Sequence, residues 1–336
     1  MTEALTKRER LSRVIAGQPV DRLPVSLWRH FYVEETAAAP LAARLAQWHR
    51  RFDFDLLKIN VRAQYHTEGW GARFAYSGQE HVKPQRVDLP VKAAADFAGL
   101  AVLDPRSGPL GEMLELIRLL RSDLGRDEVL LMTVFNPMSV AHDLIGGADR
   151  LADAIADSPQ AVHAGLRAVT DTFRDFAMLC LDQGADGLFF ATTHAATAET
   201  FTLEQVEEFG RPYDMEILDA VDGAFMNMLH VCQPRAYVRE LVDYPVHAIN
   251  WDTNHATNPT LADMRAAVGD KALAGGLSRE RFPAQESGRA FVRELAAARE
   301  MMGDRPFIVA STCTIPTDTL DENIDVVCRA VRGAQL

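Results

Sequence analysis

The sequence has few cysteines for its length and lacks the paired motifs that mark small metal-binding and redox modules. Cys180, Cys232, Cys313 and Cys328 are the four among 336 residues, and no CxxC pair occurs. Four widely spaced cysteines do not make a disulfide framework for a chain of this size, and a reducing compartment would keep them as thiols. Burial or metal binding must therefore explain them.

Long apolar runs and a surplus of basic residues are also missing. No segment approaches the roughly 20 apolar residues of a membrane span, and the charged N-terminal stretch has no apolar core of signal-peptide length. We therefore expect a cytoplasmic protein that does not associate with membranes. The 47 acidic residues outnumber the 35 basic ones, giving a formal charge of -12. Because nucleic-acid affinity draws on clustered Lys and Arg, nucleic acid is not an expected partner.

Low-complexity tracts and Pro/Gly/Ser-rich linkers are absent, while 48% of the residues are hydrophobic, enough for a large core. Short β-branched or aliphatic runs alternate with longer segments of helical periodicity, a pattern that predicts a parallel sheet with crossover helices. The eight expected strands are residues 23–28, 56–59, 130–135, 187–191, 225–231, 248–251, 272–274 and 307–310. This pattern predicts an α/β fold of the (β/α)8 TIM-barrel type.

Helical periodicity fills the intervals between these runs. The expected helices are residues 41–52, 111–124, 148–181, 203–221, 235–242, 260–268, 288–301 and 319–331. Thr202 and Asp318 precede two of them as expected start signals, with acidic residues close behind. We expect one domain over residues 1–336, with an N-terminal helix at about residues 4–17. The irregular residues from about 64 to 105 are expected to form an excursion over the barrel mouth.

A metal site is predicted where two expected strands end. His230 and Cys232 are separated by one residue, so in an extended strand both side chains point to the same face. Cys313 comes just after the last expected strand, and closure of a barrel brings strand ends around a common mouth. Three protein ligands with an open fourth position are typical of catalytic zinc, and thiolates favour zinc over magnesium or calcium.

Two points about this site stay open. Asp252, after the next strand, is predicted to act in catalysis and to fill the fourth position until substrate displaces it. Alternatively, Cys232 and Cys313 are buried small residues, because free cysteine is among the most buried residue types. Cys180 and Cys328 lie in helical stripes and are assigned to the core.

Five motifs resemble the uroporphyrinogen decarboxylase superfamily. They are GQPVDRLPVSLW near the start, GADGLFF followed by LEQVEEFGRPY, then HVC, and TIPTDTLDENI. The resemblance runs from about residue 8 to residue 332 and implies a TIM barrel. HxC with a distant cysteine is similar to the zinc-dependent branch that transfers methyl groups between corrinoids and thiols, as in methylcobalamin:coenzyme M methyltransferases. This resemblance implies His230, Cys232 and Cys313 as zinc ligands.

The chain departs from both patterns. Where the decarboxylase has Arg-Gln-Ala-Gly-Arg-Tyr to bind carboxylates, this chain reads RHFYVE from Arg29, so one arginine is lost. The decarboxylase aspartate near the second strand is replaced by Lys58-Ile59-Asn60, which disfavours porphyrinogen decarboxylation. The methyltransferase pattern Gly-Cys-Gly-Ile-Pro becomes Thr-Cys-Thr-Ile-Pro around Cys313, and Gln233 replaces the usual Gly after HxC.

We therefore predict a zinc-dependent methyltransferase that moves a methyl group between a corrinoid and a small thiol. Zinc would lower the pKa of the thiol and so generate the nucleophile. No Asp-x-His-x-x-Gly motif for cobalamin occurs, so the donor is expected to be free methylcobalamin or a separate corrinoid protein. Trp70 and Phe74 either stack on the corrin or pack within the excursion.

Six further residues are expected at the mouth as substrate-binding groups: Arg29, His30, Lys58, Asn60, His194 and Asn250. Arg29 either binds an anionic tail such as a sulfonate or carboxylate, or forms a salt bridge on the barrel rim. Two other functions stay open. One is a metal-free decarboxylase or lyase acting on a small carboxylic acid, and the other is a non-catalytic partner of a corrinoid protein.

Overall fold

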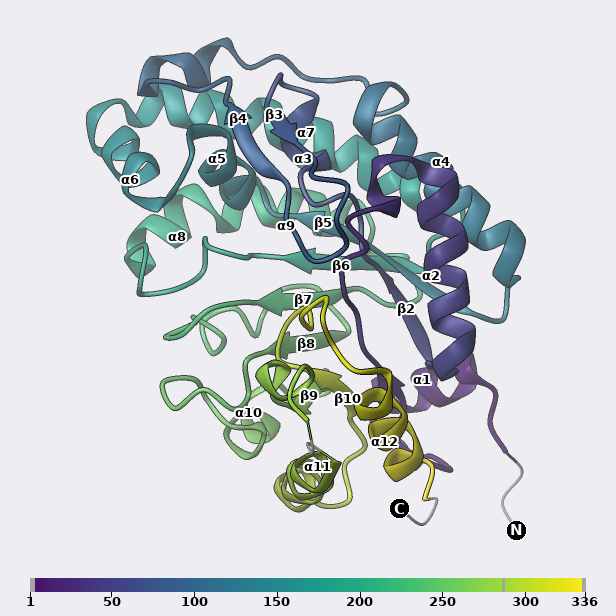
Figure 1. Cartoon of the computed structure of the whole chain (residues 1–336). Helices are drawn as coiled ribbons and strands as arrows, with labels where there is room; N and C mark the ends of the chain where they lie inside the picture. The colour runs from purple at the N-terminus through teal and green to yellow at the C-terminus, as the bar shows by residue number, and fades with distance from the viewer. Residues whose placement is uncertain (1–3, 286–287, 334–336) are drawn as a thin grey trace.

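Eight parallel strands curve into a nearly closed barrel in the computed structural model, which describes residues 4–285 and 288–333 (Figure 1). Neighbouring strands follow the order β1-β10-β9-β8-β7-β6-β5-β2. Their bounds are β1 (Val25–Ser26), β2 (Leu56–Ile59), β5 (Val129–Phe135), β6 (Gly187–Ala191), β7 (Met228–Val231), β8 (Ala248–Trp251), β9 (Ala272–Leu277) and β10 (Ile308–Ser311). All eight expected strands and the (β/α)8 TIM-barrel class are confirmed.

Asp55, the residue before β2, connects this strand to β1, and the contact between these two strands closes the barrel. Its backbone N–H donates to the carbonyl of Val25 at 2.9 Å, and its carboxylate accepts from the Val25 N–H at 2.8 Å. The same carboxylate is fully buried and pairs with Arg10 and Arg22, each at 2.7 Å. A buried carboxylate is tolerated only when it is paired and hydrogen-bonded, so these contacts fix where β2 meets β1.

Helices cover the outside of the barrel in Figure 1. The longer ones are α1 (Lys7–Ile15), α2 (Ala38–Phe52), α4 (Gly108–Leu124), α5 (Pro137–Ile145), α6 (Ala148–Asp157), α7 (Pro159–Asp182), α8 (Leu203–Phe209), α9 (Arg211–Asp219), α10 (Leu261–Ala267), α11 (Gly288–Met302) and α12 (Asp321–Val331). Among the described residues, none of the helices has the length and apolarity needed to cross a membrane.

Three expected helices differ from the structure. The segment 148–181 divides into α6 and α7 because Pro159, which has no N–H to donate, begins a new helix after Ser158. The segment 203–221 divides at Gly210 into α8 and α9. The helix expected at 235–242 is wrong: Arg235 has φ of 49°, which a right-handed helix does not allow.

Of the two expected helix start signals, one caps its helix and the other does not. Thr202 caps α8, since its side chain accepts from the N–H of Gln205 in a capping box. Asp318 does not cap α12, which begins at Asp321 with Leu320 as its N-cap residue. The helix α5, whose N-cap is Asn136, was not predicted from the sequence. The proline directly after this cap is a start signal that was available in the sequence.

Residues 64–105 lie between β2 and α4 and carry α3 (Tyr65–Glu68), an antiparallel pair of β3 (Arg73–Ala75) with β4 (Gln85–Asp88), and η2 (Ala94–Gly99). Among the contacts that attach this segment to the barrel mouth, Glu80 pairs with Arg29, and His81 Nδ1 lies 3.2 Å from Thr317 Oγ1. Trp70 packs on Phe173 of α7, with ring centroids 6.1 Å apart. The single domain expected over 1–336 includes residues 1–3, 286–287 and 334–336, which lie outside the described residues.

Asp214 is a buried carboxyl group between α9 and its neighbours. It accepts from Asn136 Nδ2 at 3.1 Å and from the Tyr244 hydroxyl at 2.9 Å. Burial raises the pKa of Asp214 to about 7, although both hydrogen bonds act in the opposite direction. The folded protein therefore retains a proton that the unfolded chain releases near pH 4.

Replacing this residue by Asp214→Asn should remove a pH dependence of stability. Between about pH 4 and 7 the wild-type protein should lose up to about 1.4 kcal/mol per pH unit through this group, and nothing further above pH 7. The difference in unfolding free energy between wild type and variant, measured by urea denaturation from pH 4 to 8, should show this slope. Parallel curves for the two proteins would mean that Asp214 titrates normally.

Candidate metal centre

Three donor atoms from β7 and β10 meet at the barrel mouth. His230 lies in β7, Cys232 follows that strand, and Cys313 lies two residues after β10. Their ligand atoms are all within 4.8 Å of one another. Cys313 Sγ is 3.6 Å from Cys232 Sγ and 3.6 Å from His230 Nε2. The structure thus brings together the three residues that the sequence singled out, from segments about eighty positions apart.

The spacing of these atoms fits a tetrahedral zinc ion. Zn–S bonds of about 2.3 Å and Zn–N bonds of about 2.0–2.1 Å place two sulfurs about 3.8 Å apart and a sulfur and a nitrogen about 3.5 Å apart. The two separations from Cys313 Sγ, both 3.6 Å, lie between these values, and His230 Nε2 and Cys232 Sγ are within 4.8 Å of each other. Soft sulfur with imidazole is also the donor chemistry that zinc prefers over oxygen-seeking cations.

Asn250 of β8 sets the orientation of the His230 ring. Its Nδ2 donates to the carbonyls of Ala274 and Ser311, so its Oδ1 must accept, and this oxygen lies 2.6 Å from His230 Nδ1. His230 therefore carries its proton on Nδ1 and presents Nε2 to the sulfurs. Such a partner fixes the tautomer of a metal-binding histidine. Asn250 was expected to contact substrate, but it is fully buried behind His230.

The two sulfurs stabilise one negative charge between them. The hydrogen bond from Cys232, together with His230, holds the pKa of Cys313 well below its usual value. The same contact and burial raise the pKa of Cys232. The pair of thiols therefore releases its first proton more readily than an isolated cysteine does, and its second proton less readily. A divalent cation would replace the shared proton and accommodate both thiolates.

A cavity of about 200 Å³ opens beside the donor atoms, with His230 and Cys313 in its wall. Its other lining residues include His30, Lys58, His66, Asp143, Phe189 and His194. Lys58 is buried, lies over the Phe189 ring at 4.9 Å and donates to Asn60 Oδ1 at 2.6 Å. Burial lowers the pKa of Lys58 to about 7. The cavity thus contains an amine that titrates near neutrality.

His194 was expected at the mouth, and it lines this cavity. Its Nδ1 lies 3.3 Å from Gln233 Nε2, and its ring stacks on His142 with centroids 4.6 Å apart. Burial lowers the pKa of His194, and the neighbouring His142 adds to the effect. His194 is therefore neutral at pH 7 and can accept a proton.

A chain of hydrogen-bonded polar groups at the cavity beside the donor atoms was not predicted from the sequence. Asp143 Oδ2 lies 2.8 Å from His66 Nε2, and its Oδ1 lies 2.7 Å from His142 Nδ1. Burial alone would raise the pKa of Asp143, but the hydrogen bonds from both histidines outweigh it and lower that pKa. These residues belong to α3 and α5, two helices that the strand-end argument did not anticipate.

Two expected site residues lie elsewhere. Arg29 is buried, pairs with Glu80 and packs over the Phe31 ring at 4.9 Å, so the structure supports its role as a salt bridge on the rim. Asp252 lies outside the group of three donors among the described residues. Its Oδ1 accepts from the N–H groups of Asn254 and His255, each at 3.1 Å, and this turn holds the carboxylate away from the sulfurs.

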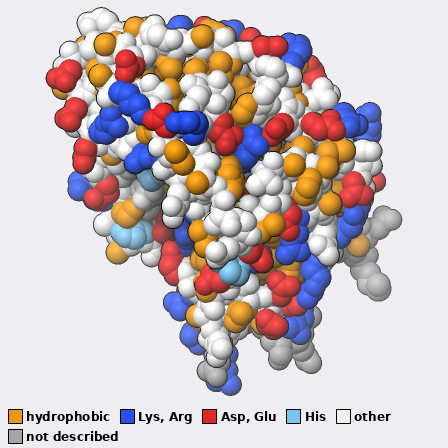
Figure 2. Space-filling view, turned by 45° about the horizontal axis from the view of Figure 1, so that its top comes forward, with side chains coloured by type: hydrophobic (Ala, Val, Ile, Leu, Met, Phe, Trp, Pro, Cys, Tyr) orange, Lys and Arg blue, Asp and Glu red, His pale blue; other side chains and the backbone are white. Residues whose placement is uncertain are grey.

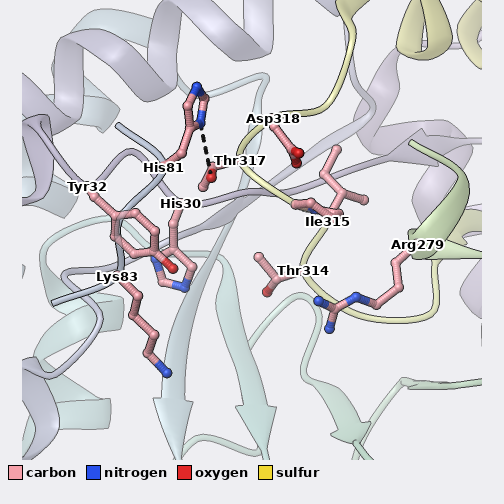
Figure 3. A pocket seen from close by; sticks show the side chains of 10 residues that line it. His30, Tyr32, His81, Lys83, Arg279, Thr314, Ile315, Thr317 and Asp318 are labelled. Carbon is pink, nitrogen blue, oxygen red and sulfur yellow. Dashed lines mark hydrogen bonds between the residues drawn. The ribbon is translucent and has the colours of Figure 1, made fainter. Parts of the chain in front are cut away.

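A second, larger cavity of about 430 Å³ lies next to the first (Figure 3). His30 lines both, and its Nδ1 lies 2.5 Å from the buried carboxylate of Glu35. The remaining lining residues are Tyr32, His81, Lys83, Arg279, Thr314, Ile315, Pro316, Thr317 and Asp318. Neither Lys83 nor Arg279 was predicted from the sequence: Lys83 lies in an irregular segment, and Arg279 begins a short 3-10 helix, η3 (Arg279–Arg281), two residues beyond the end of β9.

Comparisons with known proteins agree with this architecture. A curated relative, the methylcobamide:CoM methyltransferase MtbA of Methanosarcina acetivorans, is 25% identical over 248 residues, 69% of this chain and 71% of the relative. A uroporphyrinogen decarboxylase of Alkalilimnicola ehrlichii is 28% identical over 209 residues, 55% of this chain and 56% of its own.

Solved structures share the fold. A methyltransferase from Methanosarcina mazei superposes with a TM-score of 0.84 at 18% identity, covering 98% of this chain and 99% of that one. A B12-independent methionine synthase from Shewanella sp. W3-18-1 gives a TM-score of 0.60 at 11% identity, covering 93% of this chain and 96% of the other. The sequence model described as uroporphyrinogen decarboxylase (URO-D) matches residues 6–334. The chain therefore belongs to the uroporphyrinogen decarboxylase family.

Proposed function

We propose that this protein is a zinc-dependent methyltransferase that moves a methyl group between a corrinoid and a small thiol. The observation that carries the proposal is the cluster of His230 Nε2, Cys232 Sγ and Cys313 Sγ. Two of its separations are 3.6 Å and all three are within 4.8 Å, which suits one tetrahedral ion. Only three protein donors meet among the described residues, which leaves a fourth position for a substrate.

Bound zinc would supply Lewis-acid chemistry that lowers the pKa of an entering thiol, so that it reacts as a thiolate. Residues of the chain would hold the ion, orient its histidine ligand and accept the thiol proton. As thiolates, Cys232 and Cys313 would hold the ion with His230 and would balance its charge, so that the sulfur of a thiol substrate would stay electron-rich. Asn250 keeps His230 Nε2 pointed at the site. In the adjoining cavity, His194 and Lys58 are the groups able to take up the thiol proton.

The relatives support the proposal. The MtbA proteins are named for methyl transfer between a methylcobamide and CoM, and about seven tenths of this chain aligns with them. We propose that the methyl donor is methylcobalamin, free or on a separate corrinoid protein. We propose also that the protein acts in the cytoplasm and that Asp252 approaches the fourth position only when its turn rearranges.

Metal analysis and a spectroscopic assay test the proposal together. We expect purified protein to contain about one zinc per chain and to change the absorbance of methylcobalamin when a thiol is added. Protein that keeps zinc but shows no methyl transfer while binding a corrinoid tightly would indicate a non-catalytic partner instead. Protein that binds no zinc and decarboxylates a small acid would establish the metal-free alternative.

The Asn250–His230 contact predicts a weaker metal site in an Asn250→Ala variant. Loss of the partner that orients a metal-binding histidine should reduce zinc affinity by about 10- to 100-fold, as for other such contacts. Competition with a chromophoric chelator measures the affinity. Asn254→Ala, an exposed residue in the following turn, is the control and should bind zinc as the wild type does. Equal affinity in all three proteins would remove Asn250 from the site.

A further inference from the structure

Gln233 directly follows Cys232 and has a backbone conformation that favours glycine. Its φ is 84°, and within residues 4–285 and 288–333 the other non-glycine residues with positive φ are Asp53 and Arg235. A side chain is strained in this region because its Cβ crowds the backbone. Residues held in such conformations persist only where the surrounding structure fixes them, and they cluster at functional sites. The side chain of Gln233 is therefore expected to have a role that offsets the strain.

Two neighbouring loops fix the backbone after β7. Asn258, which is buried after β8, donates from Nδ2 to the Gln233 carbonyl at 3.1 Å and accepts from the Ala236 N–H at 3.0 Å. From the loop after β6, the Thr197 hydroxyl donates to the Pro234 carbonyl. The segment is thus held by the loops of both strands that flank β7, and these contacts keep Gln233 in its conformation.

The side-chain amide of Gln233 connects a ligand sulfur with the cavity. Its Nε2 lies 3.9 Å from Cys232 Sγ and 3.3 Å from His194 Nδ1. The first distance is at the outer limit of an N–H···S hydrogen bond, which is long because sulfur is a large atom. A metal-bound thiolate can only accept a hydrogen bond, so the amide must present its NH2 group, whose two N–H bonds serve both partners. His194 Nδ1 then accepts, and the proton of its neutral ring lies on Nε2.

Only one of the two ligand sulfurs receives this contact. Among the described residues, Cys313 Sγ has Cys232 Sγ and His230 Nε2 as its hydrogen-bond partners. The positive charge of Arg279 favours the thiolate form of both cysteines. On the face shown in Figure 2, acidic and basic side chains are intermixed, and salt screens such surface charges beyond about 8–10 Å. The Gln233 amide is therefore a contact that distinguishes Cys232 from Cys313.

We propose that Gln233 is a positioning residue of the metal centre, whose amide hydrogen-bonds the Cys232 thiolate and holds His194 with its proton on Nε2. This inference rests on the zinc site of the proposed function. A hydrogen bond to a metal-bound thiolate draws electron density from the sulfur, so the ion becomes a stronger Lewis acid toward an entering ligand. His194 lines the cavity beside the donor atoms, so the same amide also orients a residue that an entering molecule meets.

Two substitutions separate the amide from the backbone. Gln233→Ala removes the amide and keeps a Cβ at the positive φ, whereas Gln233→Gly removes both. With Co²⁺ bound in place of zinc, the sulfur-to-cobalt charge-transfer absorption should move to longer wavelength equally in both variants, because a thiolate without its hydrogen bond gives up electrons more easily. Both should bind zinc about 10- to 100-fold more weakly. Without metal, the glycine variant should unfold at a higher temperature than the alanine variant, since glycine adopts this φ without strain.

The ring nitrogens of His194 provide a second, independent signal. In ¹⁵N NMR spectra, the wild-type ring should show the Nε2–H form, and both Gln233 variants should show a mixture of the two neutral forms. Arg235→Gly is the control, because it relieves the other positive φ of this segment at an exposed residue. This variant should keep the wild-type absorption and the wild-type His194 signal.

None of these measurements requires turnover, so the inference and the proposed function can fail separately. Unchanged absorption and unchanged His194 signals in both Gln233 variants would overturn the positioning role and leave the zinc site standing. A shift in only one of the two variants would assign the effect to the backbone and would also overturn it. Wild-type protein without any sulfur-to-cobalt absorption would instead contradict the ligand set, and with it both the inference and the proposed function.

Discussion

Cys313→Ser should lose both zinc and methyl transfer while keeping its fold. Structural zinc sites with four protein ligands bind with about 10–16 kcal/mol in total. Removing one of only three protein ligands should therefore weaken zinc binding by about 100-fold or more. Methyl transfer should fall in proportion to the zinc that remains. Metal content after dialysis and the rate of methylcobalamin consumption measure the two effects, and circular dichroism checks the fold.

A cysteine outside the site provides the control for this experiment. Cys180 is fully buried in α7, and burial raises its pKa. Cys180→Ala should retain zinc and activity, apart from a modest loss of stability from the small cavity. Wild-type zinc content in Cys313→Ser would contradict the assigned ligand set. Loss of zinc without loss of methyl transfer would separate the metal from the chemistry.

The largest effect on stability is expected at Asp55. Its carboxylate has no solvent exposure and bridges Arg10, Arg22 and the N–H of Val25. Asp55→Ala leaves Arg10 with Asp21 as its carboxylate partner, removes the ion pair of Arg22 with Asp55, and removes the hydrogen bond from the Val25 N–H to the Asp55 carboxylate. Breaking a buried pair in this way costs about 3–5 kcal/mol. The loss should appear as a lower free energy of unfolding in urea.

An exposed ion pair gives the matched control for Asp55. Asp325 on α12 pairs with Arg51 at 2.7 Å, but both side chains are substantially exposed. Asp325→Ala should therefore change stability little, because solvent screens surface pairs. Similar unfolding free energies for the Asp55 and Asp325 variants would mean that the barrel does not depend on the buried bridge for its closure.

The barrel was predictable from the sequence because the strands of a buried parallel sheet are short runs made almost entirely of apolar residues. The same logic predicted that His230, Cys232 and Cys313 come together, since they lie at strand ends that barrel closure must bring together. The helix prediction was wrong at 235–242, where polar contacts hold the chain: the N–H of Arg235 donates to Thr257 Oγ1. Helical periodicity carries no information about such long-range hydrogen bonds.

Other parts of the site depend on contacts that no local pattern encodes. Arg29 and Asn250 were predicted to bind substrate, and the sequence does not reveal that Arg29 pairs with Glu80 or that Asn250 contacts His230. Lys83, in the irregular link between β3 and β4, and Arg279, at the start of the 3-10 helix that follows β9, both line the larger cavity. Their proximity follows from how the excursion and the loop after β9 fold over the barrel.

X-ray absorption spectroscopy at the zinc edge of the zinc-loaded protein tests the central claim most directly. It should show two sulfur neighbours at about 2.3 Å and a nitrogen at about 2.0–2.1 Å, with one sulfur lost in Cys232→Ser. Addition of a thiol should introduce a third sulfur neighbour. A zinc shell made of nitrogen and oxygen alone, unchanged by the cysteine substitution, would contradict the assignment of these three residues.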